Sequence, residues 1–521
     1  MKLLSLKPGH DGHIVSIESS HLKFLLEAEK DSFPRYSEIN PTILIESFSM
    51  LNEIPDVICL SGWVKGFHSI EPKQGAGYFG IDNSLTQRKE LNFFGHKINF
   101  FSSTHERSHI LCSYGLSNFK QGEPCYFLLW EGTLGNFYEI DEFVNIKLLA
   151  SVMPEPGNKY SFLFSLADPR YKDVFRFESA GKLMALAAFS DRTALNYEEK
   201  KIIDYIIDKA ILKTTKKSDL YWSRFFNIGV ENNEFKNLAG KFSDALFDKF
   251  YQFALHNCKK GYPLLIGGGC GLNCEWNTKW KDSGIFPEVF VPPISNDAGA
   301  ALGTAIDAQF YFTGNAKISW DVYSGAEFNF DADNLADWKA EKLDLFRVAK
   351  FIQDDNIIAW VQGKCEIGPR ALGNRSLLGP PFKKETQSLL NNIKNRESYR
   401  PIAPICLQED VSSLFEWSGE SPYMLYFQKI KNNRLQAISH VDNTARVQTV
   451  TSQSNNKMYQ LLLKFKELTG FGVLCNTSLN HNGRGFINSM SDLADYCYKM
   501  NIEGFVVNEL FYTKINKYNA I

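Results

Sequence analysis

The sequence THERSHI places His105 and His109 four positions apart. On a helix this spacing puts both imidazoles on one face, within reach of a single metal ion. The same letters spell H-E-x-x-H, the zinc-peptidase pattern, with Glu106 as the base and Glu123 or Glu131 as a third ligand. Two histidines on a solvated helix face give the same letters. The spacing alone therefore leaves a metal centre, a zinc peptidase and a plain helix surface open.

Two segments rich in glycine, proline and arginine follow in the second half, GKCEIGPRALGNRS and NIKNRESYRPIAP. Between residues 364 and 400 there are only three acids to oppose their charge. Rigid turns such as Gly368-Pro369 suit arginines that grip phosphate or carboxylate in bidentate fashion, and a solvated basic surface does not need them. We therefore predict an anion site, and its basic residues are Lys364, Arg370, Arg375, Lys394, Arg396 and Arg400.

Two expected turns from strand to helix carry further candidates. The first contains Gly267, Gly268, Gly269 and Asn273, but neither the P-loop lysine nor the G-x-G-x-x-G spacing is present. Successive glycines still let a backbone approach phosphates or a ribose, although a tight turn explains them equally well. In the second turn, Asp297 begins a helix, either as its N-cap or as a ligand.

Polar residues at three other places could complete a site. His10 lies at the tip of an expected hairpin, where it could act as a general base. Arg446 follows in DNTARVQTV, and Asn476 and Ser478 end an expected strand. These last three are either donors to the same anion or ordinary turn residues.

The elements around these residues predict an α/β fold. Strand, glycine-rich turn and helix occur twice in succession, an arrangement whose ligands lie at the carboxyl ends of strands. The polar segment 329–342 is expected to be a junction between domains 1–335 and 343–521, the first duplicated within itself. The expected elements are hairpins over 3–19 and 125–140, helices over 41–51, 343–354 and 384–395, and a mostly helical stretch over 178–258.

Composition limits the class of protein. The 521 residues are 44% hydrophobic and 22% charged with a net charge of −2, so no global charge favours nucleic acid or an anionic membrane. Neither a secretory signal nor a membrane-spanning run is visible. Ten cysteines without a C-x-x-C pair indicate reduced thiols and a cytoplasmic protein.

Taken in order, the motifs resemble the O-carbamoyltransferases of antibiotic biosynthesis and nodulation-factor decoration. The resemblance extends over nearly the whole chain. It implies an N-terminal actin-like ATPase (ASKHA) domain, similar to that of tRNA threonylcarbamoyltransferases, and a smaller YrdC-like C-terminal domain. The motifs that carry it are KPGHDG (7–12), H-x-x-x-H (105–109), GKLMALA (181–187), GGGCGLN (267–273), SNDAGAALG (295–303), IGPRALGNRS (367–376), RESYRPIAP (396–404), SPYML (421–425), HVDNTARVQTV (440–450) and LCNTSLN (474–480).

The resemblance also implies a reaction. The second domain would make carbamoyl-adenylate from carbamoyl phosphate and ATP, and the first would transfer the carbamoyl group to a hydroxyl of a small molecule or sugar, using Fe²⁺ or a similar divalent metal. His105, His109 and Asp297 match the metal ligands, and His10 matches the base. Arg370, Lys394, Arg446 and Ser478 match the carbamoyl phosphate and nucleotide pocket, and Gly267 to Gly269 with Asn273 match the nucleotide-facing loop.

One departure and three alternatives remain. The chain has Glu131-Gly132 where the family has Asp-Gly, which leaves a contact between Glu131 and the metal open. A zinc peptidase leaves Asp297 and the arginines without a role. A non-catalytic nucleotide-binding protein would not need the arginines and His10 together, and threonylcarbamoyl transfer to tRNA lacks a basic stripe. We therefore expect neither a nucleic-acid nor a membrane partner, and the oligomeric state stays open.

Overall fold

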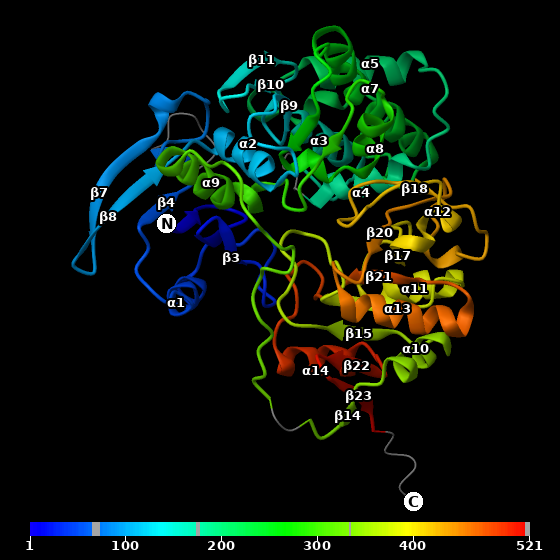
Figure 1. Ribbon diagram of the computed structural model, residues 1–521. Helices are drawn as coiled ribbons and strands as arrows, with labels where there is room; N and C mark the ends of the chain where they lie inside the picture. The colour runs from blue at the N-terminus through cyan, green and yellow to red at the C-terminus, as the bar shows by residue number, and fades with distance from the viewer. Residues whose placement is uncertain (65–72, 173–177, 333–334, 516–521) are drawn as a thin grey trace, which may run out of the picture.

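A computed structural model describes residues 1–64, 73–172, 178–332 and 335–515 (Figure 1). The first domain begins with a six-stranded sheet in the order β3-β2-β1-β4-β8-β7. Strand β1 is antiparallel to β2 and parallel to β4, and β4 is parallel to β8. The strands are β1 (Lys2–Lys7), β2 (His13–Glu18), β3 (His21–Glu27), β4 (Val57–Leu60), β7 (Gln87–Phe93) and β8 (His96–Ser102).

A five-stranded sheet in the order β11-β10-β9-β12-β13 repeats this topology. Strand β9 is antiparallel to β10 and parallel to β12, and β12 is parallel to β13. The two sheets confirm the expected hairpins and the expected internal duplication, and this repeat agrees with an actin-like architecture. The strands are β9 (Cys125–Trp130), β10 (Gly135–Ile140), β11 (Ile146–Ser151), β12 (Leu264–Gly267) and β13 (Val289–Phe290).

Helices α2 (His105–Leu116) and α9 (Ala300–Thr313) pack against each other, and one hydrophobic core joins them to both sheets. Their backbones touch at Gly303, where a Cβ atom would lie 1.8 Å from the carbonyl oxygen of Ser108. Arg107 of α2 makes a buried bidentate bond to Asp307 of α9, with N···O distances of 2.6 and 2.8 Å. These contacts fix where the first residue of α2 lies relative to the turn that precedes α9.

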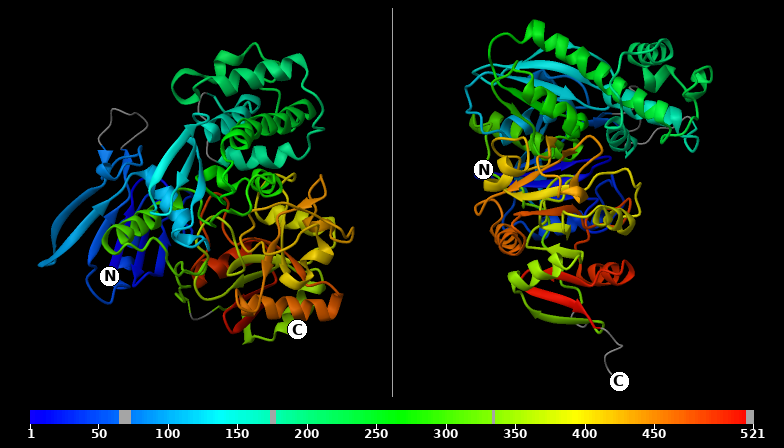
Figure 2. Two further views of the ribbon diagram at one scale, coloured as in Figure 1. Left: turned by 45° about the horizontal axis from the view of Figure 1, so that its top comes forward. Right: turned by 90° about the vertical axis from the view of Figure 1, so that its right-hand side faces the viewer.

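Apart from α1, the larger remaining helices of the first domain gather on the side of the molecule away from the β7–β8 hairpin (Figures 1 and 2). The cap and proline predicted a helix after residue 40, and α1 (Pro41–Ser49) begins there with the Asn40 side chain as its N-cap. The stretch expected to be mostly helical holds α4, α5 and α7 around a buried apolar cluster. The larger helices here are α3 (Pro156–Ala167), α4 (Glu178–Ala187), α5 (Tyr197–Asp208), α7 (Asn233–Asn257) and α8 (Cys274–Asp282).

The second domain is an eight-stranded mixed sheet in the order β14-β23-β22-β15-β16-β21-β17-β20. Both faces are buried: Ile358 and Trp360 of β15 enter one apolar cluster, and Ala359 and Val361 enter another. The strands are β14 (Trp338–Lys342), β15 (Ile358–Val361), β16 (Arg375–Gly379), β17 (Ala403–Leu407), β20 (Gln448–Val450), β21 (Val473–Ser478), β22 (Gly504–Val507) and β23 (Leu510–Lys514). The helices include α10 (Leu345–Gln353), α11 (Lys384–Ile393), α13 (Asn456–Thr469) and α14 (Met490–Lys499).

The structure corrects the expected junction at 329–342. Residues 338–342 form the edge strand β14, paired with β23 from the end of the chain. Its three charged residues hid it, because an edge strand buries little of its surface and shows no sustained apolar pattern. The sheet of the second domain therefore begins at Trp338, before the predicted boundary at 343.

All ten cysteines are free thiols, as the sequence predicted. No helix in the described part of the chain is long and apolar enough to cross a membrane.

Candidate metal and nucleotide sites

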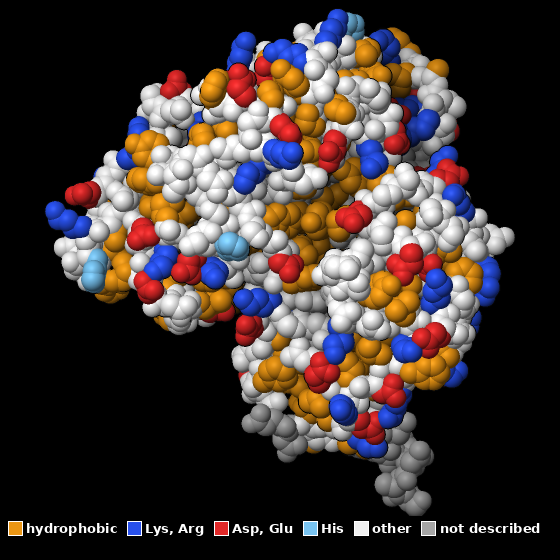
Figure 3. Space-filling view, in the orientation of Figure 1, with side chains coloured by type: hydrophobic (Ala, Val, Ile, Leu, Met, Phe, Trp, Pro, Cys, Tyr) orange, Lys and Arg blue, Asp and Glu red, His pale blue; other side chains and the backbone are white. Residues whose placement is uncertain are grey.

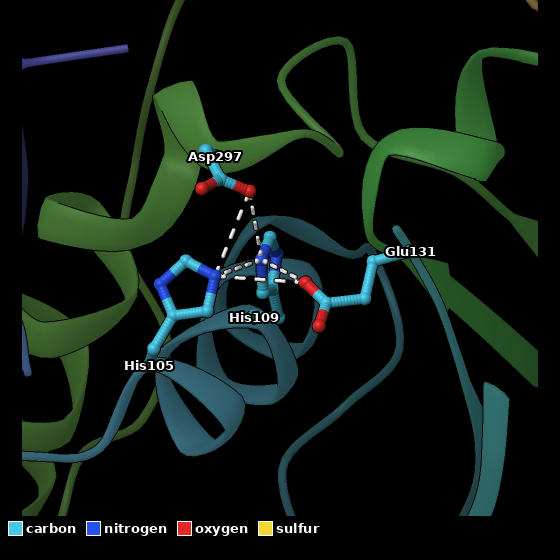
Figure 4. A group of neighbouring side chains, drawn as sticks. All are labelled: His105, His109, Glu131 and Asp297. Atoms are coloured by element: carbon cyan, nitrogen blue, oxygen red, sulfur yellow. Dashed lines mark hydrogen bonds and ion pairs between the residues drawn. The ribbon is translucent and has the colours of Figure 1, made fainter. Parts of the chain in front are cut away.

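Four side chains of the first domain converge on one point (Figure 4). Helix α2 is buried along its whole length, and it projects His105 and His109 toward Glu131, which follows β9, and Asp297, which precedes α9. The Oδ1 atom of Asp297 lies 3.6 and 3.4 Å from the Nε2 atoms of His105 and His109. The Oε2 atom of Glu131 lies 3.6 and 3.5 Å from the same two atoms. One ligand atom from each of the four residues is within 4.8 Å of the others.

The charges of this cluster support one another. Burial raises the pKa of Glu131, yet the two histidines lower it to about 2. Burial likewise opposes ionisation of Asp297, but His105 and Lys7 hold the pKa of its carboxyl well below the usual range. The two carboxylates in turn outweigh burial at His109 and raise its pKa to about 9. Two buried carboxylates beside two imidazoles therefore form a site that attracts positive charge.

The donor set fits a divalent transition metal. Imidazole nitrogen and carboxylate oxygen are ligands that iron, zinc and related ions share, and a metal-binding carboxylate is usually held by a hydrogen bond to its other oxygen. The Oε1 atom of Glu131 accepts hydrogen bonds from Tyr78 and Thr133, at 3.1 and 2.7 Å. Its Oε2 atom, 3.3 Å from the same Tyr78 hydroxyl, faces the histidines. The Asn296 side chain makes no cap hydrogen bond for the short helix that follows, and Asp297 is not an N-cap.

His10 lies at the edge of this cluster. Its Nδ1 atom is 2.7 Å from Asp11 and 3.8 Å from Oδ2 of Asp297. Its side chain is 34% exposed, whereas those of His105 and His109 are buried. His10 is therefore the histidine of this group that a ligand from outside can approach.

A second group of charged side chains gathers in the second domain. Burial, and then the neighbouring Arg446, lowers the pKa of Arg370 to about 9, and burial with Arg400 does the same for Arg396. Burial also lowers the pKa of Lys394, on which Arg396 and Arg400 act as well. Among the described residues, neither the Nε atom of Arg370 nor that of Arg446 has a hydrogen-bond partner, and both atoms are buried. Buried cations that repel one another and keep unpaired donors form a site that an anion would stabilise.

Other residues that were predicted to bind the nucleotide lie nearby. Some make structural hydrogen bonds, and one has a buried atom without a partner among the described residues. Lys394 donates to the backbone oxygens of Ser478 and Asn480 at 2.7 and 2.6 Å, which joins the end of α11 to the end of β21. The amide of Asn476 donates to Ala371 O and Gln448 Oε1, both at 3.1 Å, and the described residues offer its buried Oδ1 atom no partner.

The structure gives Arg375 a different role from the one predicted. It is fully buried, and its guanidinium donates to the backbone oxygens of Gln362, Gly363 and Asn374 and to the side chain of Asn488. These bonds hold the loop before β16. Because the donors of the guanidinium are satisfied within the protein, Arg375 has none directed at an anion. It does not join the cationic group.

In the glycine-rich turn after β12, some of the predicted residues have structural roles and one is open to a ligand. Gly268 has φ +89°, and a Cβ atom there would lie 2.5 Å from the Trp130 oxygen, so the turn itself requires this glycine. A Cβ atom built on Gly269 would have no atom of the described residues within 4 Å, so this part of the turn is open to a ligand. Asn273 caps α8 through bonds from the amides of Glu275 and Trp276.

Comparison with known proteins decides the family. Residues 89–306 match the family described as carbamoyltransferase N-terminus, and residues 349–514 match the carbamoyltransferase C-terminus. The chain belongs to the carbamoyltransferase family. It is 44% identical to a 3'-hydroxymethylcephem-O-carbamoyltransferase of Streptomyces clavuligerus, over 99% of each chain, and equally similar to the protein of that name from Amycolatopsis lactamdurans. It is 30% identical to nodulation protein U of Rhizobium tropici, over 99% of this chain and 96% of the other.

Likeness to solved structures is weaker. An activator of 2-hydroxyisocaproyl-CoA dehydratase from Clostridium difficile is 11% identical with a TM-score of 0.34, over 58% of this chain and 93% of the other. An archaeal actin homologue, Ta0583, is 12% identical with a TM-score of 0.29, over 59% and 99%. At these sequence identities and TM-scores, the solved structures say nothing about the function of the carbamoyltransferase.

In this carbamoyltransferase the H-E-x-x-H letters do not make a peptidase. Glu106 is not part of the histidine cluster, and its carboxylate accepts hydrogen bonds from the Gly80 amide at 2.6 Å and the Tyr138 hydroxyl at 2.5 Å. Glu123 is exposed and accepts from the amide of Lys120. The carboxylate that the sequence left doubtful, Glu131, is the one beside the histidines.

The two groups of the carbamoyltransferase lie on elements that touch. Arg370 of the second domain donates to the Leu272 oxygen of the glycine-rich turn at 3.2 Å. Gly368 packs against Pro293, in the same loop as Asp297, so closely that a Cβ atom would lie 2.6 Å from its oxygen. Figure 3 shows hydrophobic side chains gathered in a hollow between the helical part and the second domain.

Proposed function

We propose that this carbamoyltransferase makes carbamoyl-adenylate in its second domain and transfers the carbamoyl group to an acceptor hydroxyl in its first. The observation that carries the proposal is the pair of buried guanidinium donors on Arg370 and Arg446, without partners among the described residues, beside further cations of the second domain. A dianionic or trianionic phosphate ligand would satisfy both.

The first half-reaction has two steps. Water cleaves carbamoyl phosphate to carbamate and phosphate, and a carbamate oxygen then attacks the α-phosphorus of ATP with loss of pyrophosphate. Charge develops on phosphoryl oxygens in this step, and fixed cations such as Arg370, Lys394 and Arg446 stabilise it because they are already oriented in a water-poor site. Arg396 and Arg400 lie close enough to share that charge.

In the second half-reaction the acceptor oxygen forms a bond to the carbamoyl carbon, and the bond from that carbon to the oxygen of AMP breaks. The proton of the hydroxyl passes to His10, which the Asp11 carboxylate orients at 2.7 Å. His105, His109 and Asp297 would hold the divalent metal, with Glu131 as a fourth ligand, and the bound ion would supply Lewis-acid stabilisation of negative charge. Gly269 gives the nucleotide an open backbone to approach.

The acceptor that we propose is a small molecule with a hydroxymethyl group. This rests on the 44% identity to proteins named for 3'-hydroxymethylcephem, against 30% for nodulation protein U. A sugar hydroxyl is the second acceptor to test.

The test of the first step is pyrophosphate release from ATP. We expect release to depend on carbamoyl phosphate and to fall about 100-fold or more in Arg446→Ala, the scale on which a single charge-stabilising donor contributes. Arg434→Ala is the matched control, because Arg434 is exposed and stacks near Phe471. Release that ignores carbamoyl phosphate, or that survives in Arg446→Ala, would overturn the proposal.

The acceptor is tested separately by mass spectrometry. The purified protein, ATP and carbamoyl phosphate are incubated with a 3'-hydroxymethylcephem or with a chitin-derived oligosaccharide. We expect the cephem to gain one carbamoyl group. Carbamoylation of the oligosaccharide alone would move the proposal to the second acceptor class.

A further inference from the structure

A lysine lies beside the metal-type cluster without belonging to it. Lys7 is the last residue of β1 and its side chain is fully buried. Its Nζ atom is 3.4 Å from Oδ2 of Asp297, donates to the backbone oxygen of His10, and lies 3.9 Å from the centre of the Trp63 ring. The ammonium thus makes one hydrogen bond, one ion pair and one cation–π contact, all with groups of the protein. Lys7 therefore contacts both the metal ligand Asp297 and the turn that carries His10, and its side chain is closed off from solvent.

Three side chains next to Lys7 have the ligand atoms for a second cation. His10, Asp11 and Asp297 offer ligand atoms within 4.8 Å of one another, and Asp297 belongs to this group as well as to the histidine cluster. Its two oxygens are divided between them, because Oδ1 faces the histidines and Oδ2 faces Lys7 and His10. Carboxylates shared in this way bridge paired metal ions in hydrolytic enzymes. Here a fixed ammonium lies against Oδ2.

We propose that Lys7 is a positioning residue that replaces a second metal ion. It neutralises Oδ2 of Asp297, so that this carboxylate offers Oδ1 alone to a single metal ion, and it ties the His10 turn to the same carboxylate. This inference rests on the proposed function and deepens it, because it makes the transfer site mononuclear. The cation–π contact with Trp63 compensates the ammonium for lost water.

The backbone of the turn that carries His10 is held in a specific conformation. Gly9 has φ +77°, and a Cβ atom there would lie 2.5 Å from Nε1 of Trp63, so the turn can rest on the indole only with glycine. Asp11 also has a left-handed backbone, with φ +53°, which costs free energy in a residue other than glycine. The turn that holds His10 is thus strained and packed on Trp63, and Lys7 is the side chain that joins both to Asp297.

The experiment is a calorimetric titration of the metal-free full-length protein with Co²⁺. We expect one Co²⁺ per chain for the wild type. In Lys7→Met, which keeps the length of the side chain and removes its charge, His10, Asp11 and Oδ2 of Asp297 become available, and we expect two. Lys2→Met is the control on the same strand, since Lys2 is paired with Glu53 at the surface, and it should bind one.

The kinetic readout is separate from the titration. Transfer to the acceptor should fall about 100-fold in Lys7→Met, the cost of a displacement of about 1 Å in the reacting groups, while pyrophosphate release stays unchanged. Two Co²⁺ per wild-type chain at this site, or one in a folded Lys7→Met, would refute the role of Lys7 and leave the proposed function standing. A wild-type chain that binds no Co²⁺ would count against the proposed metal site itself. Should Lys7→Met not fold, Lys7→Gln, which also removes the charge, takes its place in the titration with the same expected stoichiometry of two.

Discussion

At the scale of single residues, two glutamates that the sequence could not rank have opposite surroundings. Glu131 faces His105 and His109 through Oε2, at 3.6 and 3.5 Å. Glu106, the base of the peptidase alternative, is bonded to the Gly80 amide and the Tyr138 hydroxyl. Glu106 therefore braces the start of α2, and Glu131 belongs with the metal-type cluster.

Glutamine substitutions separate these roles. Glu131→Gln replaces an anionic ligand with a neutral one, and we expect the affinity for Co²⁺ to fall about 10- to 100-fold, the scale on which groups around a metal site contribute. Glu106→Gln should keep its Co²⁺ affinity within about threefold, and should retain most of its carbamoyl transfer, because it touches neither metal nor substrate. Loss of transfer only in Glu106→Gln would contradict this assignment.

At the scale of elements, strand β3 and the residues after it hold a loop of the second domain. Glu27 accepts a hydrogen bond from the Gly368 amide at 2.7 Å, and Lys30 donates to the Gly368 oxygen at 2.8 Å. Lys30 also lies 3.5 Å from Glu27 and 3.8 Å from the centre of the Phe486 ring. Burial raises the pKa of Glu27, and Lys30 opposes that shift. Arg370 lies two residues after Gly368. The buried pair Glu27 and Lys30 therefore fixes the position of the backbone that carries this arginine.

Breaking the pair should destabilise the protein. In Lys30→Met we expect the free energy of unfolding to fall by about 3 kcal/mol, because Glu27 is left as an uncompensated buried charge. Combining it with Glu27→Gln should recover part of the loss. Lys23→Met on the exposed face of β3 is the control and should cost under about 1 kcal/mol. Denaturant unfolding measures all three, and additive losses in the double variant would argue against a coupled pair.

At the scale of the whole molecule, the two groups of reactive residues meet across the contact between domains. Gly368 packs on Pro293, near Asp297, and Arg370 bonds to the Leu272 oxygen of the glycine-rich turn. The carbamoyl-adenylate that we propose is prone to hydrolysis, and a contact this close suits its passage between the domains without release to water. We expect one carbamoylated product for each pyrophosphate released.

Opening that contact should uncouple the two steps. Gly368→Ala places a methyl group against the Pro293 oxygen, and we expect the ratio of product to pyrophosphate to drop at least about twofold while pyrophosphate release continues. Gly363→Ala is a matched control: its φ is also positive, at +37°, but nothing described lies within 4 Å of the added atom. Equal ratios in both variants would show that the contact does not guide the intermediate.

The sequence by itself determined the local structure and the order of the motifs. The hairpins, the helix capped by Asn40 and the two strand–turn–helix units were predictable, because turn residues and apolar periodicity act over a few neighbours. The spacing of His105 and His109 fixed a shared face for the same reason. Where local signals were weak, as in the exposed edge strand β14, the prediction missed the element.

Only the tertiary structure decided which distant residues meet. The packing of α2 on α9 at Gly303 brings Asp297 to the histidines, and the β9–β10 turn brings Glu131 to them. The fold likewise encloses Arg375 in carbonyl oxygens, and leaves Arg370 and Arg446 with buried donors that no described residue satisfies. One-dimensional patterns record residue type and period, whereas a ligand site depends on distances between side chains of separate elements, which close packing sets.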